Sequence, residues 1–199
     1  MWNEILKSLF IITLLLSVLV AFSVQAASDE SVNLSPDKVW RAVVECNSTG
    51  ADCTVYVQRV GSKEMHWVLK EPFPKQPVVH WLSAGLLEVR VRCGSPCNAS
   101  IFFSPAKGVS TTHPSVIAVN PDRLVLAIAD NARPKPAVVV LPIFGEQKPL
   151  AVAALNFSPV AALVSAITKA SFLPSGELEL AYTSGAEFND AYERVKVKY

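Results

Sequence analysis

Apolar and polar residues alternate along several short segments of the chain. The clearest segments are 87–92, 124–128 and 178–182, and a shifted copy of the pattern occupies 40–46. Successive side chains of a β-strand point to opposite faces, so a period of two places one set of residues on a core face and the other set outside. The pattern therefore predicts β-strands in these four segments.

Each of these strands follows a turn of similar composition. An apolar residue, a short run of Ser, Asn, Pro, Asp or Gly and a second apolar residue five positions on occur in the segments 34–39, 82–87, 119–124 and 173–178. These turn residues supply the fixed or left-handed backbone angles that a chain reversal requires. A second strand is predicted after each alternating one, at 54–57, 100–103, 137–141 and 192–197.

Two of these turns carry a resemblance to known proteins. The segments LSPDKV (34–39) and VNPDRL (119–124) resemble the turn between the first two strands of a β-propeller blade. The chain is thus similar to β-propeller-like repeat proteins of the bacterial periplasm, which implies a propeller-like meander of about four units. The units start 37 to 54 residues apart, at positions 34, 82, 119 and 173. Because this irregular spacing favours an antiparallel β-sandwich or open barrel, the predicted class is all-β with these architectures as alternatives.

One segment breaks the pattern of strands. Ser158 and Pro159 suit the start of a helix, and the Ala-rich segment 160–170 places Leu163 and Ile167 at helical spacing. A short helix is predicted near 159–170, although β-branched residues in its second half also tolerate a strand.

The first 26 residues have the pattern of an export signal. Lys7 precedes an apolar run at 9–22, and compact residues at Val24 and Ala26 suit cleavage after Ala26, with Ala27 as the alternative site. The apolar run is shorter than the roughly 20 residues that span a bilayer as a helix, so cleavage is favoured over an uncleaved membrane anchor. The sequence predicts a signal peptide at 1–26 and one β-rich domain at 27–199, located in the periplasm or secreted.

Composition narrows the class of protein further. The chain is 51% hydrophobic, 18% charged and has a formal net charge of +1. Such a balance argues against a nucleic-acid partner, which would require a clustered basic face. So apolar a chain also buries enough surface to fold rather than stay disordered.

Four cysteines, Cys46, Cys53, Cys93 and Cys97, follow the predicted signal. Disulfides persist after export, and the pairs Cys46–Cys53 and Cys93–Cys97 are favoured because each brackets a turn between strands. A crossed pairing would instead join separate units. The spacing within the pairs does not suit structural zinc, and Cys93–Cys97 lacks the two-residue spacing of a redox motif.

Catalytic motifs are missing from the sequence. It contains no G-x-S-x-G elbow, H-E-x-x-H helix, P-loop or G-x-G-x-x-G turn, and its three histidines are far apart. We expect a protein that is not an enzyme, with no catalytic residue, metal or cofactor.

These observations favour an exported binding protein that presents rigid loops to another envelope or secreted protein. The expected contact residues are Ser95, Pro96 and Asn98 in one loop and Asn47 and Asp52 in a second. An inhibitor or immunity protein that plugs the cleft of a cell-envelope hydrolase would act in this way, because a pre-ordered loop loses less entropy on binding. If both loops lie at one end of the fold, they form a binding edge.

Two other functions remain open from the sequence. One is an envelope structural or assembly factor whose strands pair with neighbouring proteins. The other is a carbohydrate-binding module that stacks sugars on Trp40, Trp67 or Trp81. These tryptophans lie in apolar strands, which are more often core than binding platform.

Overall fold

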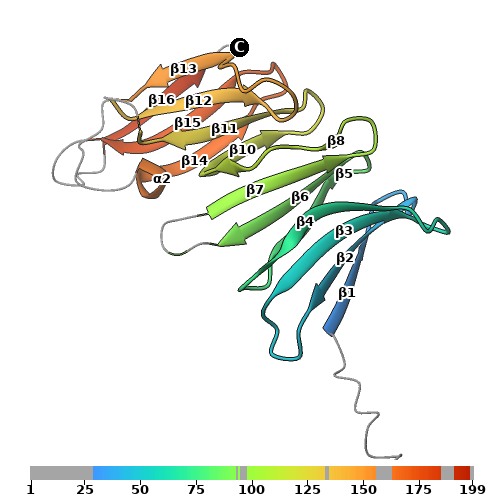
Figure 1. Ribbon diagram of the computed structural model, residues 1–199. Coiled ribbons are helices and arrows are strands. Elements are labelled where there is room, and N and C mark those ends of the chain that lie inside the picture. The colour runs from blue at the N-terminus through green and yellow to red at the C-terminus, as the bar shows by residue number, and fades with distance from the viewer. Residues whose placement is uncertain are drawn as a thin grey trace, which may run out of the picture.

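The computed structural model describes residues 29–92, 94, 98–132, 135–155, 163–184 and 191–197. They form an all-β fold of four antiparallel sheets with one short helix (Figure 1). The all-β prediction is confirmed, and the described strands form successive sheets rather than a closed barrel. The predicted signal at 1–26 lies outside the described residues. The helix in the described part of the chain is too short to cross a membrane.

The strands pair with their neighbours in the sequence, so each sheet is a meander. Sheet A contains β1 (Asp29–Leu34), β2 (Trp40–Cys46), β3 (Cys53–Arg59) and β4 (Met65–Phe73). Sheet B contains β5 (Val78–Ser83), β6 (Leu86–Arg92), β7 (Asn98–Ser104) and β8 (Gly108–Val109), and β9 (His113–Pro114) also pairs with β7.

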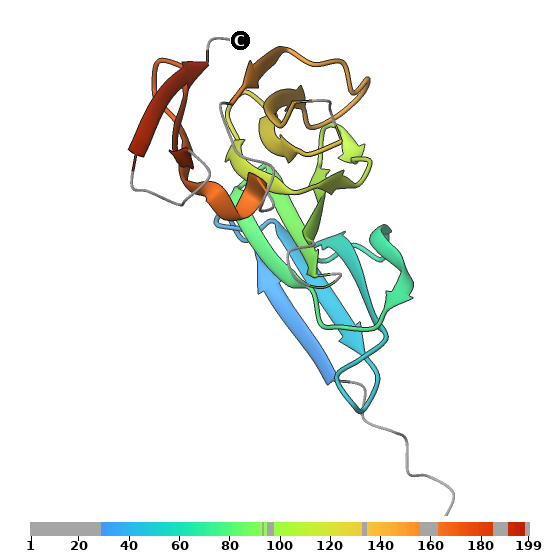
Figure 2. The ribbon, with the colours of Figure 1, turned by 90° about the vertical axis from the view of Figure 1, so that its left-hand side faces the viewer.

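The second half of the chain repeats this arrangement. Sheet C contains β10 (Val116–Asn120), β11 (Val125–Asp130), β12 (Ala137–Pro142) and β13 (Ala151–Ala154). Sheet D contains β14 (Ile167–Phe172), β15 (Leu178–Ser184) and β16 (Ala191–Val197). Sheet A and sheet D lie at opposite ends of the molecule in both ribbon views (Figures 1 and 2).

Consecutive sheets pack face to face through three apolar clusters. Alternate residues of sheet A, such as Val44 and Val57, contact Val89 and Phe103 of sheet B. The opposite face of sheet B contributes Phe102 to the cluster shared with sheet C. Sheets C and D share a third cluster, which includes Val138, Val140, Leu178 and Leu180. Sheets B and C are therefore covered on both faces, which explains why β12 is an almost unbroken apolar run.

The predicted turns form through their short polar side chains. Ser35 Oγ donates a hydrogen bond of 2.6 Å to Asp37 Oδ1 and accepts one of 2.9 Å from the Trp40 amide. The hydrogen bonds from Ser35 and from the Val39 amide lower the pKa of Asp37, because they favour the ionised carboxylate. Lys38 adopts the left-handed region, with a φ of 60°.

The predicted helix is present but much shorter than expected. Helix α2 spans Leu163–Ala166, and the chain continues directly into β14 at Ile167. Ile167 pairs with Tyr182 and Ala170 with Leu180, so the second half of the predicted helix is a strand of sheet D. The β-branched residues Ile167 and Thr168 favour a strand. Pairing with β15 also gives the backbone more hydrogen bonds than one further turn of helix would. Residues 159–162 lie outside the described part of the chain.

Candidate binding loops

The first candidate loop joins β2 to β3 and is closed by a disulfide between Cys46 and Cys53. Their Cα atoms lie 4.1 Å apart across the sheet. This bond confirms one of the two local pairs predicted and excludes a crossed pairing of either residue with Cys93 or Cys97. The Cys93–Cys97 pair stays a prediction, because both residues lie outside the described part of the chain.

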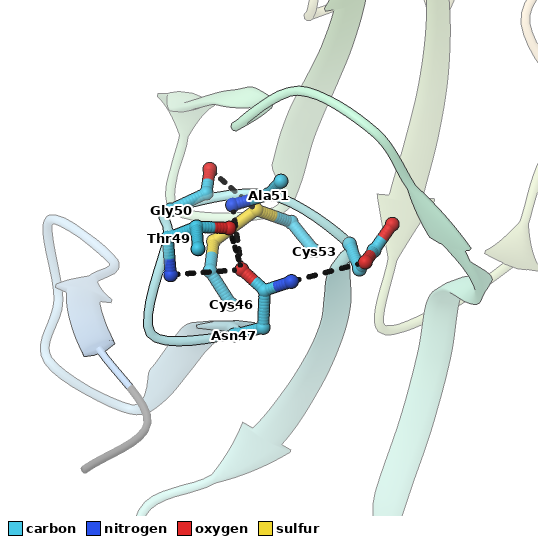
Figure 3. Close-up of a disulfide and its surroundings, with 7 residues drawn as sticks. Cys46, Asn47, Thr49, Gly50, Ala51 and Cys53 are labelled. Carbon is cyan, nitrogen blue, oxygen red and sulfur yellow. Dashed lines mark hydrogen bonds between the residues drawn. A yellow bond between two sulfur atoms is a disulfide. The ribbon is translucent and has the colours of Figure 1, made fainter. Parts of the chain in front are cut away.

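The side chain of Asn47 lies inside this loop and organises it (Figure 3). Its Oδ1 accepts hydrogen bonds from the Thr49 amide at 3.1 Å, from Thr49 Oγ1 at 2.7 Å and from the Ala51 amide at 2.9 Å. Its Nδ2 donates to Asp52 Oδ2 at 3.0 Å. One amide side chain thus satisfies four groups of a six-residue turn, as Asn commonly does where the backbone reverses.

Backbone bonds complete the loop. The Asn47 amide donates to the Ala51 carbonyl and the Gly50 amide donates to the Asn47 carbonyl, each at 2.9 Å. Gly50 and Asp52 adopt the left-handed region, with φ values of 72° and 51°, which Gly and Asp tolerate best. Asn47 was predicted as a contact residue, but its amide is used within the loop. The exposed side chains here belong to Ser48, Thr49 and Asp52.

The second candidate loop, 93–97, connects β6 to β7. Ser95 and Pro96, the predicted tip, lie outside the described residues. Asn98 is half-buried at the first position of β7, where it pairs with Arg92, so it lies at the base of this loop. Its Oδ1 is buried and has no hydrogen-bond partner among the described atoms.

The two strands that precede the candidate loops, β2 and β6, begin at the same end of sheets A and B. Trp40 begins β2 and Phe103 is near the end of β7, and their rings lie 5.6 Å apart. His66, near the start of β4, contacts the same two rings at 5.9 and 5.4 Å. Figure 1 shows the C-terminal ends of β2 and β6 directed to the same side of the molecule. We call this side, with residues 47–52, the loop end.

A buried polar group ties β6 to β7 beneath the second loop. Glu88 was predicted to be solvent-facing, but its side chain is only 6% exposed. Its Oε1 accepts a hydrogen bond of 2.6 Å from Ser100 Oγ and one of 2.9 Å from Arg90 Nη2. The alternating pattern placed Glu88 on the correct face of sheet B. This face is buried rather than exposed, because sheet C covers it. The Glu-x-Arg spacing was a signal for a same-face ion pair.

The opposite end of the molecule is hollowed beside two of the predicted turns, 119–124 and 173–178. One hollow of about 380 Å³ is lined by residues that include Lys107, Arg123 and Phe144. A second, of about 340 Å³, shares Arg123 and extends to the turn at 173–174. Gly176 adopts a φ of 91°, a conformation that residues with a side chain rarely adopt, and the Arg123 guanidinium lies beside it. These hollows are separate from the loop end.

The tryptophans proposed as a sugar platform separate into two groups. Trp81 is buried in the apolar cluster between sheets A and B, and Trp40 is partly buried against the same cluster. Trp67 is 39% exposed on the outer face of sheet A, edge-on to Tyr56 at 5.3 Å. Stacking of a ligand is thus restricted to Trp67 among these three residues.

The buried histidine, His113, is held by the backbone. Its Nε2 lies 3.0 Å from the Ile143 carbonyl oxygen, and its ring contacts Phe102. Burial lowers the pKa of His113, and the bond to the Ile143 carbonyl opposes this shift. The residue fixes β9 between sheets B and C.

No protein-family model matches this chain, and a comparison with curated proteins found no match either. The functional proposal therefore rests on the geometry of the loop end.

Proposed function

We propose that this protein is an exported, non-catalytic binding protein that contacts another envelope or secreted protein through its loop end. The observation that carries the proposal is the rigid loop at 47–52, whose exposed side chains lie at one end of the packed sheets A and B. The loop at 47–52 is held by a disulfide and by the Asn47 hydrogen bonds.

The rigidity of this loop lowers the entropy cost of binding a partner. Association costs about 0.5–1.5 kcal/mol for each flexible side chain that is immobilised, together with the ordering of any mobile backbone. The bonds inside the loop order its backbone before a partner arrives. The exposed side chains of Ser48, Thr49 and Asp52 then face a partner from a fixed frame.

The specific form we favour is an inhibitor or immunity protein for a cell-envelope hydrolase. A narrow hairpin tip that projects beyond the sheets fits a concave active-site cleft better than a flat surface does. Such a protein needs no catalytic group of its own. The periplasm or the secreted space, where the disulfide is stable, is the compartment that this role requires.

The test compares two matched substitutions at opposite ends. Ser48→Arg places a long cation on the exposed loop tip, whereas Ala84→Arg places the same side chain on the exposed β5–β6 turn at the other end of sheet B. The purified variants and the unmodified protein are used to capture partners from an envelope extract, and captured hydrolases are assayed for inhibition.

We expect one partner to be retained by the unmodified protein and by Ala84→Arg and lost by Ser48→Arg. Its measured affinity should fall by about ten-fold or more, as expected for a buried contact at an interface. If both variants retain the partner equally, the loop end is not the surface that binds it. No partner at all, together with unchanged lysis sensitivity of a deletion strain, would overturn it.

A further inference from the structure

Four exposed apolar side chains gather at the end of sheet A that is opposite the loop end. They are Leu34 at 49%, Val39 at 38%, Val60 at 52% and Met65 at 47% exposure. Successive turns of a meander lie at alternate ends of a sheet, so the β1–β2 and β3–β4 turns share this end and the β2–β3 loop lies at the other. We call residues 34–41 and 58–65 the tip of sheet A.

The strand register brings these four side chains into one patch. Leu34 and Met65 are the two outer members of a row of paired residues that crosses all four strands. The Val60 amide donates a hydrogen bond of 2.9 Å to the Val39 carbonyl, which extends the β2–β3 ladder by one pair. Val39 and Val60 lie two residues beyond the middle members of the row, and therefore on the same face. Figure 1 shows both turns projecting together on the right of sheet A.

Positive charge is concentrated at the tip. Its four cations are Lys38, Arg41, Arg59 and Lys63, and its two carboxylates are Asp37 and Glu64. The remainder of β1 to β3, residues 29–33 and 42–57, contains four carboxylates and neither Lys nor Arg. The charge of these strands is thus segregated, with an excess of positive charge at the tip and negative charge toward the loop end.

The positive charge of the tip is not neutralised within the described part of the chain. None of the four cations forms an ion pair with a described carboxylate. Arg41 Nε donates to the uncharged amide of Gln58 at 3.0 Å, which holds the guanidinium in place. Asp37 Oδ1 instead accepts hydrogen bonds from Ser35 Oγ and from the Val39 amide within its own turn. The cations are therefore available to an anionic partner.

We propose that the tip of sheet A docks on the surface of an anionic lipid bilayer. The aliphatic side chains enter the boundary between head groups and acyl chains. Lys and Arg lay their apolar stems beside them and extend their charged groups to the lipid phosphates. The negative surface potential of the bilayer attracts the excess of positive charge. The acidic loop end then points away from the membrane.

A lipid surface explains the composition of the tip better than a protein partner does. Protein interfaces are enriched in aromatic residues and Arg and depleted of Lys. The exposed apolar residues of the tip are Val, Leu and Met, and two of its four cations are Lys. Two hairpin turns also present a narrow surface, whereas a specific protein interface buries about 800 Å² on each partner.

The test is co-sedimentation with vesicles of phosphatidylcholine, with and without phosphatidylglycerol. The protein is purified after export, and mass spectrometry establishes its N-terminus, so that an apolar segment retained at 9–22 is not mistaken for the tip. We expect the protein to bind the vesicles that contain phosphatidylglycerol. This binding should weaken as the salt concentration rises, because salt screens exposed charges.

Two matched pairs of substitutions locate the binding surface. Val60→Asp should weaken vesicle binding by about ten-fold or more, since it places a carboxylate in the apolar patch. Val152→Asp, on an exposed valine of sheet C, is its control and should bind normally. Lys63→Glu should also weaken binding by about ten-fold or more, because it reverses one charge at the anionic surface. Lys135→Glu, on an exposed residue between β11 and β12, changes net charge equally and should bind nearly normally.

Each remaining outcome overturns the proposal. Failure to bind the anionic vesicles does so, and so does binding that the tip variants and their controls weaken equally. Equal binding to both kinds of vesicle shows that the cations do not contribute. If Val60→Asp leaves vesicle binding unchanged but loses a protein captured from the envelope extract, the tip is a protein interface instead. Far-UV circular dichroism and thermal unfolding establish that each variant is folded.

Discussion

At the scale of single residues, two polar side chains hold the loops and sheets in place. Asn47 satisfies the turn between β2 and β3, and Glu88 joins Ser100 and Arg90 between sheets B and C. Each has several partners, and those of Glu88 matter most because a buried polar group without a partner costs about 1–3 kcal/mol. Polar residues in this fold therefore specify local geometry as well as solubility.

Replacement of Asn47 by Ala should destabilise the protein by about 0.5–1.5 kcal/mol, because the amides of Thr49 and Ala51 exchange their bonds to Asn47 for bonds to water. The measurement is urea unfolding of the oxidised protein. Ser48→Ala, at an exposed neighbouring position, is the control and should change stability by less than about 0.5 kcal/mol. Equal effects of the two substitutions would show that Asn47 does not organise the loop.

His113 should make stability depend on pH in the mildly acidic range. Burial lowers the pKa of His113 in the folded protein below the ordinary histidine value of about 6.5, so the unfolded chain binds a proton more readily. Stability is then complete above the unfolded pKa and declines as the pH falls through and below it. Comparison of unfolding between pH 7.5 and pH 5 in the unmodified protein and in His113→Gln tests this. A slope that survives unchanged in the variant would contradict the assignment.

At the scale of elements, the unit that repeats is an antiparallel meander whose turns are fixed by short polar residues. The β2–β3 hairpin adds a covalent closure to this scheme. Closure of so short a loop reduces the entropy of the unfolded chain modestly, by an amount worth about 2–3 kcal/mol in the chain-entropy model. Its larger consequence is local, because it holds the ends of both strands together at the loop end.

The double substitution Cys46→Ser with Cys53→Ser should lower the free energy of unfolding by about 2–3 kcal/mol. It should also increase proteolytic cleavage within 47–52, since the Asn47 bonds alone then hold the turn. Denaturant unfolding and limited proteolysis measure the two effects. Cleavage that appears elsewhere in the described chain before it appears in this loop would argue against a local role for the disulfide.

At the scale of the whole molecule, stability comes from sheets stacked in sequence order. Sheets B and C each contribute to two apolar clusters, so the sheets in the middle of the stack couple those at its ends. The open face of sheet A and the loop end are surfaces that this arrangement leaves accessible.

Phe102→Ala should destabilise the protein by about 3–5 kcal/mol, because this fully buried ring fills the cluster between sheets B and C. If the sheets unfold as one cooperative unit, near-ultraviolet and far-ultraviolet circular dichroism should report the same midpoint. Val109→Ala, on an exposed residue of the same sheet, is the control and should have little effect. Two separated transitions in the variant would instead show that the stack divides at this cluster.

The sequence by itself determined the elements of this protein. Period-two alternation predicted β6 and β15, and Pro-Asp turns predicted where β2 and β11 begin, because strand pleating and turn angles depend on neighbouring residues. The local pairing of Cys46 with Cys53 was also predictable, since a single hairpin brings them together.

Only the tertiary structure decided which faces are buried and which segments meet. It buried Glu88 by placing sheet C over it and turned Ile167–Ala170 from helix into strand by pairing them with β15. It also left Trp67 exposed while Trp81 is buried. These outcomes depend on contacts between residues far apart in the chain, and local pattern carries no information about which sheet covers which face.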